Sequence, residues 1–383
     1  MSVYLDFNAS APIDERVLEV MISTYKNIIG NADSRTHDFG AAANKVVENA
    51  RKRVAHILGI SSSEVLFTSG STESNNIAVQ GLRDYAKKTE KKHIITTSIE
   101  HKSVLESAKA LQKEGFEVDF LEPDSSGQIS VERLKELVRT DTLLVSIMHV
   151  NNETGIIQPV SEIGEYLSDK NIYFHVDATQ SFGKLVDELK NLKYDMLSMS
   201  AHKISGPQGV GVLVLRKKNH KSPPVTGIMY GGQQERGIRP GTIPVALIAG
   251  LGKACILAEE NYADNEIKCR HIKDEIIKIL SESGVSYEIN GKPEMCICST
   301  LNICFHGVSS EALMLSTKHY LSISNGSACN SNSYKPSYVL SAMGIPEEKI
   351  YDSVRISWGP QSDEEEIKEA IKRIAGMASS LAF

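Results

Sequence analysis

The sequence predicts an α/β protein with a large, mostly parallel sheet covered by helices and a smaller α/β domain toward the C-terminus. Two observations support this prediction. Short apolar runs alternate with amphipathic stretches between about residues 60 and 260, and a different mixture of helices and strands begins near residue 261. Alternation of strand and helix is typical of a parallel sheet with helices on both faces.

The expected strands of the large sheet are short, apolar and bounded by polar or turn residues. They cover residues 65–68, 94–97, 143–148, 173–176, 196–199 and 211–215. An example of the helices between them is residues 101–114, where Val104, Leu105, Ala108 and Leu111 form one apolar stripe. Ligands of such sheets bind beyond the carboxyl ends of the strands, so polar residues there are candidate site residues.

The region after residue 261 opens with a long helix pattern and continues with strands near residues 301–305 and 354–357. A last helix is expected to begin at Ser362, because Glu365 three residues later completes a capping-box pattern. We therefore expect a large domain over residues 16–260. Residues 1–15 and 261–383 are expected to form the small domain.

Composition excludes several classes of protein. The chain has 383 residues, 41% of them hydrophobic, and a net charge of −6 without a basic block, which disfavours direct nucleic-acid binding. We expect no signal peptide and no membrane span, because the N-terminus lacks a basic and apolar leader and no apolar run reaches about 20 residues. A cytoplasmic, reducing location is the expectation, and it would keep thiols free.

The first candidate site segment is residues 68–73, Thr-Ser-Gly-Ser-Thr-Glu, which follows a strand and opens a helix. Small residues there, Ser71 and Thr72 among them, let backbone N–H groups and hydroxyls reach an anion at the helix N-terminus. An ordinary strand-to-helix turn with a capping serine is the alternative interpretation.

Asp177 ends one predicted strand, and Lys203 follows the next strand along the chain. A buried carboxylate needs a partner, and the protonated pyridine nitrogen of pyridoxal phosphate (PLP) is one. A partly desolvated lysine amine can bind a carbonyl carbon covalently. An aspartate that caps a turn and a solvated surface lysine are the alternatives, but the two residues in succession after an anion-binding segment favour a cofactor site.

Three further residues could carry chemistry. Cys329 lies among Gly, Ser and Asn residues, which indicates an accessible loop thiol able to act as a nucleophile, although a chance loop cysteine is the alternative. His101 could stack on a flat ring or simply begin a helix. Arg355 could hold a substrate carboxylate with two hydrogen bonds or be a surface charge on an edge strand. A metal site at Cys296 and Cys298 lacks a second ligand pair, so no metal is expected.

Together these segments resemble the class V aminotransferase family of PLP-dependent transferases of fold type I, and within it the cysteine desulfurases of the NifS/IscS type. The resemblance runs from Tyr4 to Ser357. Its motifs are residues 67–75 (Phe-Thr-Ser-Gly-Ser-Thr-Glu-Ser-Asn), 100–102 (Glu-His-Lys), 148–155 (Met-His-Val-Asn-Asn-Glu-Thr-Gly), 175–180 (His-Val-Asp-Ala-Thr-Gln), 201–203 (Ala-His-Lys), 239–242 (Arg-Pro-Gly-Thr) and 326–329 (Gly-Ser-Ala-Cys).

The resemblance implies a role for each matching position. Lys203 would hold PLP covalently, Asp177 would pair with its ring nitrogen, Gln180 would contact its ring hydroxyl and His101 would stack on the ring. The phosphate would be bound by small and polar residues, namely Ser71, Thr72, Ser200, His202 and, from a partner subunit of a homodimer, Thr242. The substrate would be bound by Asn152 and Arg355.

The implied reaction converts L-cysteine to L-alanine, with the sulfur taken up as a persulfide on Cys329 and passed to an acceptor protein. Residues 30–37, 229–237 and 357–360 also resemble the desulfurases of DNA phosphorothioation systems. The chain ends at Phe383, before the longer C-terminal tail with which housekeeping desulfurases dock iron–sulfur scaffolds, and this departure puts that partner in doubt.

Several alternatives stay open at this level. The sulfur could serve iron–sulfur clusters or tRNA thiolation, and a selenocysteine lyase or a transaminase would share the fold. Cys329 argues against a transaminase, which needs no loop thiol. A non-catalytic scaffold would not need Lys203, Asp177, His101 and Cys329 together.

Overall fold

The computed structural model describes residues 2–325 and 336–382. Its main feature is a seven-stranded sheet with the order β2-β8-β7-β6-β5-β3-β4. β8 runs antiparallel to both of its neighbours and the other pairs are parallel, so the predicted mostly parallel sheet is confirmed. The strands are β2 (Val65–Thr68), β3 (His93–Thr97), β4 (Glu117–Leu121), β5 (Thr142–Met148), β6 (Tyr173–Asp177), β7 (Met196–Ser200) and β8 (Gly211–Leu215).

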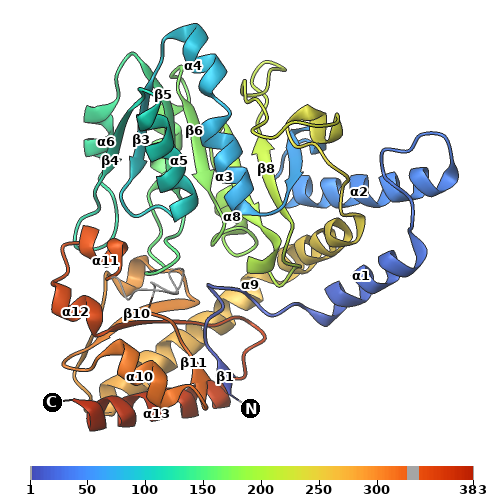
Figure 1. Ribbon diagram of the computed structural model, residues 1–383. Helices are drawn as coiled ribbons and strands as arrows, with labels where there is room; N and C mark the ends of the chain where they lie inside the picture. The colour runs from blue at the N-terminus through green and yellow to red at the C-terminus, as the bar shows by residue number, and fades with distance from the viewer. Residues whose placement is uncertain (1, 326–335, 383) are drawn as a thin grey trace.

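Helices cover both faces of this sheet because its strands are apolar on both sides (Figure 1). Within β5, for example, Leu144 packs in one core cluster while Val145 and Ile147 pack in the cluster on the other face. The covering helices are α1 (Glu15–Asn27), α2 (Asp38–Ile57), α3 (Ser71–Gln80), α4 (Arg83–Thr89), α5 (Lys102–Lys113), α6 (Val131–Leu137), α7 (Val160–Leu167), α8 (Val186–Asn191) and the first half of α9 (Val245–Glu282).

α9 is longer than the sequence pattern indicated, since it begins at Val245 and not near residue 261. Its first turns are apolar all round and therefore show no amphipathic stripe. Gly252 lets α2 approach closely, because a Cβ there would lie 2.9 Å from the Cβ of Ala50. The expected domain boundary at residue 261 thus falls inside one continuous helix that runs from the large sheet to the smaller one (Figure 1).

The smaller body holds an antiparallel sheet of β12 (Ser353–Ser357), β10 (Thr300–Phe305) and β9 (Tyr287–Ile289). Next to it, β1 (Val3–Tyr4) pairs with β11 (Leu321–Ser322), which brings the N-terminus beside the C-terminal part of the chain (Figure 1). A separate core forms around Trp358, which is 2% exposed. The helices here are α10 (Ser310–Thr317), α11 (Tyr338–Ala342), α12 (Glu347–Tyr351) and α13 (Glu364–Leu381).

Two sequence predictions need correction here. The cap of α13 is Asp363, whose carboxylate accepts from the N–H of Glu366 at 2.9 Å, whereas Ser362 accepts from the N–H of Gly359. The edge strand β4 was not expected, because its residues are largely half-exposed and its apolar pattern is weak. None of the described helices combines the length and the apolar character needed to cross a bilayer.

Candidate active site

The carboxyl ends of β6 and β7 and the N-termini of α3 and α5 bring the predicted cofactor residues together. Asp177 is the last residue of β6, paired with Met148 of β5 and Ser198 of β7. Lys203 follows β7 in a short 3-10 turn. Parallel strands end at the same edge of a sheet, and this explains why residues far apart in sequence meet here.

Asp177 is a buried carboxylate, 4% exposed, held by neutral donors. The side-chain amide of Asn75 donates to it at 2.7 Å and the backbone N–H of Thr179 donates at 3.0 Å, with the Thr179 hydroxyl as a third donor. No residue in the described part of the chain forms an ion pair with it. A buried anion without a cation is a suitable partner for a protonated ring nitrogen.

His101 is the N-cap of α5, as the sequence predicted for a residue that opens this helix. Its Nδ1 accepts from the backbone N–H of Ser103 at 3.1 Å. Asn75 also donates to the Ser103 hydroxyl at 2.8 Å, so one amide links the neighbours of His101 to Asp177. Burial lowers the pKa of His101 against the opposing effect of Asp177. A neutral imidazole is therefore expected at pH 7.

The Lys203 ammonium donates to the carbonyl oxygens of Asn8 at 2.5 Å and Ala9 at 2.7 Å. Burial, followed by the nearby Arg355 cation, lowers the pKa of Lys203 to about 7. A large part of this amine is therefore unprotonated near neutral pH, which a lysine needs to attack a carbonyl carbon or remove a proton.

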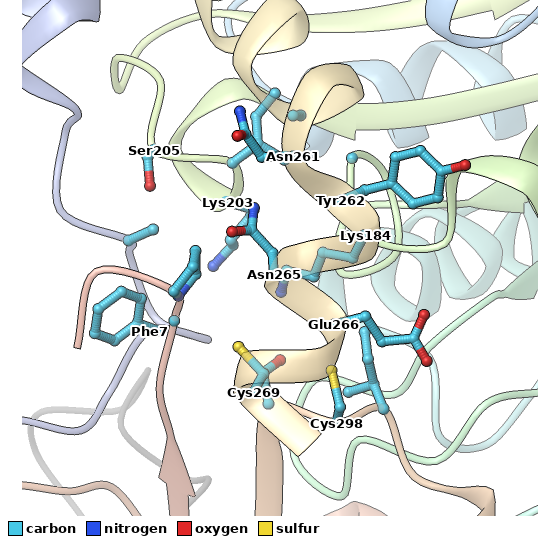
Figure 2. A pocket seen from close by; sticks show the side chains of 18 of the residues that line it. Phe7, Lys184, Lys203, Ser205, Asn261, Tyr262, Asn265, Glu266, Cys269 and Cys298 are labelled. Atoms are coloured by element: carbon cyan, nitrogen blue, oxygen red, sulfur yellow. The ribbon is translucent and has the colours of Figure 1, made fainter. Parts of the chain in front are cut away.

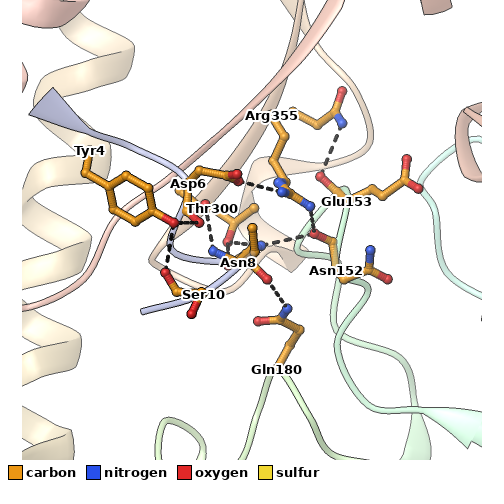
Figure 3. Close-up of polar contacts among 12 residues, drawn as sticks. Tyr4, Asp6, Asn8, Ser10, Asn152, Glu153, Gln180, Thr300 and Arg355 are labelled. Carbon is orange, nitrogen blue, oxygen red and sulfur yellow. Dashed lines mark hydrogen bonds and ion pairs between the residues drawn. The ribbon is translucent and has the colours of Figure 1, made fainter. Parts of the chain in front are cut away.

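Gln180 lies beside Lys203 and shares one of its acceptors. Its amide donates to the Asn8 carbonyl at 3.0 Å (Figure 3), while its buried Oε1 has no partner in the described structure. An unsatisfied buried acceptor is costly and points to a missing donor. The ring hydroxyl of PLP is a donor of the required kind.

Arg355 of β12 is buried, so the alternative of a surface charge on an edge strand is wrong. Its guanidinium contacts the Asp6 carboxylate at 2.5 Å and donates to the backbone carbonyl of Asn152 at 3.0 Å (Figure 3). Arg355 Nε and the side-chain oxygen of Asn152 are both buried without a partner in the described chain. One donor and one acceptor are thus available beside each other for a polar ligand.

The expected phosphate residues lie around the N-terminus of α3. Gly70 precedes this helix and no side chain caps it, so the first N–H groups are available to an anion. Ser71 and Thr72 open the helix, and the Ser200 hydroxyl lies 3.6 Å from where a Cβ on Gly70 would be. A cavity of about 600 Å³ is lined by Thr72 and His101.

The two remaining phosphate candidates are His202 and Thr242. His202 is oriented by Ser10, 3.2 Å from its Nδ1, and burial lowers the pKa of His202 to about 4, so it is neutral. Thr242 is exposed on the segment before α9. Its expected role toward a partner subunit remains a prediction.

Sequence reasoning missed several residues that build this site. Asn75 lies inside a quoted motif but its contact with Asp177 could not be inferred, and the acceptor Asn8 and the Arg355 partner Asp6 lie near the chain start. Burial also raises the pKa of Glu100 to about 8 and that of Glu153 to about 7. Both glutamates lie inside motifs quoted above, but the polar residues around them in the sequence gave no signal of burial.

Cys329 lies outside the described residues, but residues on both sides of that segment contact the site. Ser324 forms an antiparallel bridge with Arg355, and the Ser337 hydroxyl donates to Glu153 at 2.5 Å. Of the other thiols, Cys296 is buried and donates to the Thr154 carbonyl at 2.7 Å, whereas Cys298 is half-buried.

Comparison with known proteins decides the family. The family model for class V aminotransferases matches residues 3–369. The chain belongs to the class V aminotransferase family. Members of this family use PLP, which fits the buried anion at Asp177, the unsatisfied Gln180 oxygen and the desolvated Lys203 amine.

Within this class V family the chain is similar to cysteine desulfurases. A relative from Pasteurella multocida named cysteine desulfurase IscS is 42% identical over the whole chain and 94% of its own length. A solved NifS-like protein superposes with a TM-score of 0.91 at 37% identity, with full coverage of both chains. DndA from Streptomyces lividans superposes with a TM-score of 0.81 at 42% identity, over 92% of this chain and 98% of its own.

Proposed function

We propose that this class V enzyme is a cysteine desulfurase that converts L-cysteine to L-alanine and places the sulfur on Cys329 as a persulfide. The observation that carries this proposal is the amine of Lys203, which burial and Arg355 keep largely neutral at pH 7 beside the buried Asp177 carboxylate. PLP, when bound, supplies an electron sink that stabilises negative charge at the substrate carbons.

The chain's own residues supply the remaining steps of this proposal. Arg355 and Asn152 orient the substrate carboxylate and amino group, using the Nε and Oδ1 atoms that lack partners. The Lys203 amine removes the α-proton. The Cys329 thiolate then attacks the substrate sulfur, so an S–S bond forms as the Cβ–S bond breaks. Cβ takes the electron pair and a proton, and alanine leaves.

The geometry around residues 326–335 supports Cys329 as the acceptor of sulfur. The chain leaves the described structure after Asn325, next to the Ser324–Arg355 bridge, and returns at Pro336, next to the Ser337–Glu153 hydrogen bond. Both Arg355 and the 152–153 segment belong to the proposed substrate site. A persulfide is reversible, so the sulfur can pass to an acceptor protein.

We also propose a homodimer in which Thr242 reaches the partner's phosphate site. Large apolar side chains are exposed on α1 and just after it, at the start of α2 and at residues 228–230. Solvent-facing apolar groups of this kind mark interfaces. These side chains are Leu18, Ile22, Tyr25, Ile29, Phe39, Ile228, Met229 and Tyr230, the last of them 98% exposed. In the same proposal, residues 16–260 form the large domain, and residues 1–15 and 261–383 the small one.

The proposed pathway is sulfur supply for DNA phosphorothioation through a protein acceptor in the cytoplasm. Residues 30–37, 229–237 and 357–360 resemble desulfurases of those systems, and DndA is 42% identical to this chain. Sulfur delivery to iron–sulfur clusters or tRNA is the competing pathway. Direct DNA binding is not part of the proposal, because the net charge is −6.

The test is turnover of cysteine by the PLP-loaded protein, with alanine and protein-bound persulfide measured for wild type and Cys329→Ser. We expect alanine and a persulfide on the Cys329 peptide in wild type, and loss of both in the variant. Cys255→Ser, which alters a buried thiol of α9, is the matched control. Alanine formation at the wild-type rate by Cys329→Ser would show that Cys329 is not the nucleophile.

A further inference from the structure

A second cavity, of about 370 Å³, opens where α9 passes from the large sheet to the small one (Figure 2). Its walls come from α9, from the segment after β6 that holds Lys184, and from residues 296–299 before β10. Lys203 contributes to one wall, so the cavity borders the proposed active site. Nothing in the proposed desulfurase reaction uses its other side chains.

Three cysteines line this cavity, Cys269 of α9, Cys296 and Cys298. The Cys296 thiol is engaged by the Thr154 carbonyl, and the other two are seen in Figure 2. Figure 2 shows Cys269 and Cys298 next to one another, and each thiol affects the pKa of the other. Among the described cysteines, Cys298 alone is half-buried, and Cys255, Cys269, Cys296 and Cys304 are buried. Reactivity of a thiol requires access, so Cys298 is the one that a small reagent in the cavity can reach first.

The cavity also holds a basic side chain whose protonated form would stabilise a thiolate. The side chain of Lys184 lines the cavity and has no hydrogen-bond or ion-pair partner within residues 2–325 and 336–382. Burial lowers the pKa of its amine, and the two thiols oppose this effect because a thiolate favours the ammonium form. Arg270 of α9 adds positive charge, and Glu266 one turn earlier opposes it. The contact with Cys269, with Lys184 as a further cause, lowers the pKa of Cys298, and the same contact raises the pKa of Cys269. Two thiols in one cavity, of which the more accessible has the lower pKa, suit the roles of an attacking and a resolving cysteine.

We propose that Cys298 is a second sulfur-accepting thiol, which takes sulfane sulfur from small persulfides or inorganic polysulfide in this cavity, and that Cys269 resolves it. In the first step the Cys298 thiolate attacks the outer sulfur of R–S–SH, a new S–S bond forms, and R–SH leaves with the proton. Cys298 then carries a persulfide.

In the second step Cys269 attacks the inner sulfur of this persulfide. A Cys269–Cys298 disulfide forms, the outer S–S bond breaks, and hydrogen sulfide leaves with the Cys269 proton. The two thiols are oxidised and the sulfane sulfur is reduced, so no other oxidant is needed. A dithiol reductant restores the pair. The site therefore removes stray sulfane sulfur close to the place where the proposed reaction generates it.

The disulfide would also link α9 to residues 296–298, which contact residues 155 and 156. Ile297, next to Cys298, donates its N–H to the Gly155 carbonyl at 2.9 Å, and Ile156 forms a bridge with Cys296. Residues 152–153, which belong to the proposed substrate site, directly precede this contact. Oxidation of the pair is thus expected to change cysteine turnover.

The experiment uses PLP-loaded protein carrying Cys329→Ser, so that the proposed nucleophile does not compete. Sodium polysulfide is added without cysteine, which makes the result independent of desulfurase turnover. Alkylation after short times and peptide mass spectrometry report each cysteine. We expect Cys298 to react at least about 10-fold faster than the buried Cys255 and Cys304. A Cys269–Cys298 disulfide and one sulfide per disulfide should follow.

Three variants separate the roles. Cys269→Ser should keep the persulfide on Cys298 without a disulfide, and Cys298→Ser should leave Cys269 unmodified. Lys184→Gln should slow the reaction of Cys298 with polysulfide by about 10-fold, which corresponds to about one unit in the pKa of Cys298. Lys184→Arg should restore the wild-type rate of this reaction. Melting temperatures and bound PLP identify any variant that fails to fold.

The proposal is overturned if Cys298 reacts no faster than Cys255 in the folded protein. It is also overturned if its persulfide persists although Cys269 is present, because Cys269 would then not be a resolving thiol. If Cys298 of Lys184→Gln reacts with polysulfide at the wild-type rate, Lys184 does not stabilise the Cys298 thiolate.

Discussion

The titration of Lys203 tests the central feature of the site. A pKa of about 7, against the ordinary 10.5, leaves about half of the amine neutral at pH 7 instead of about 1 part in 3,000. This difference corresponds to about 5 kcal/mol. Burial is the first cause and the Arg355 cation the second, so Arg355→Gln should raise the pKa of Lys203 but leave it below 10.5. Asp6, released from its ion pair, would add to the rise.

The assay is the rate of acetylation of Lys203 against pH in cofactor-free protein, measured on its peptide by mass spectrometry. The exposed Lys52 of α2 in the same sample is the internal control. We expect the midpoint for Lys203 near pH 7 in wild type and at a higher pH in Arg355→Gln. If Lys203 reacts in parallel with Lys52 over the whole pH range, its amine is not desolvated and the argument for its role is wrong.

Three other predictions follow from single contacts. Asn75→Ala removes the 2.7 Å hydrogen bond to the Asp177 carboxylate and should weaken PLP binding by about 10- to 100-fold in an absorbance titration, whereas an unchanged affinity would show that Asn75 does not orient Asp177. Glu100 has a folded pKa of about 8, above its ordinary 4.5, so the folded wild type loses stability as pH rises from 4.5 to 8. Glu100→Gln should therefore gain about 1–2 kcal/mol relative to wild type between pH 5 and pH 8 in urea unfolding, and a pH-independent difference would contradict this. Trp358→Ala removes a side chain that is 2% exposed and should cost about 3–5 kcal/mol, with Trp358→Phe as the milder control, and a loss below about 1 kcal/mol would show that this core relaxes.

The sequence by itself determined the large sheet and the positions of its key residues. Six of its seven strands are apolar on both faces, and this signal depends only on local composition and not on neighbours. Asp177 and Lys203 were predictable because they lie at, or within a turn of, the carboxyl ends of such strands. The family followed from motifs that cover residues 67 to 329.

Only the tertiary structure decided which groups contact one another. Lys203 donates to carbonyls near the chain start, Arg355 pairs with Asp6, and Asn75 bridges Asp177 and Ser103, all across more than 25 positions of sequence. The start of α9 and the Cys269–Cys298 pair were equally out of reach. A pKa or a hydrogen bond depends on burial and on atoms brought from distant segments, and a linear pattern records neither.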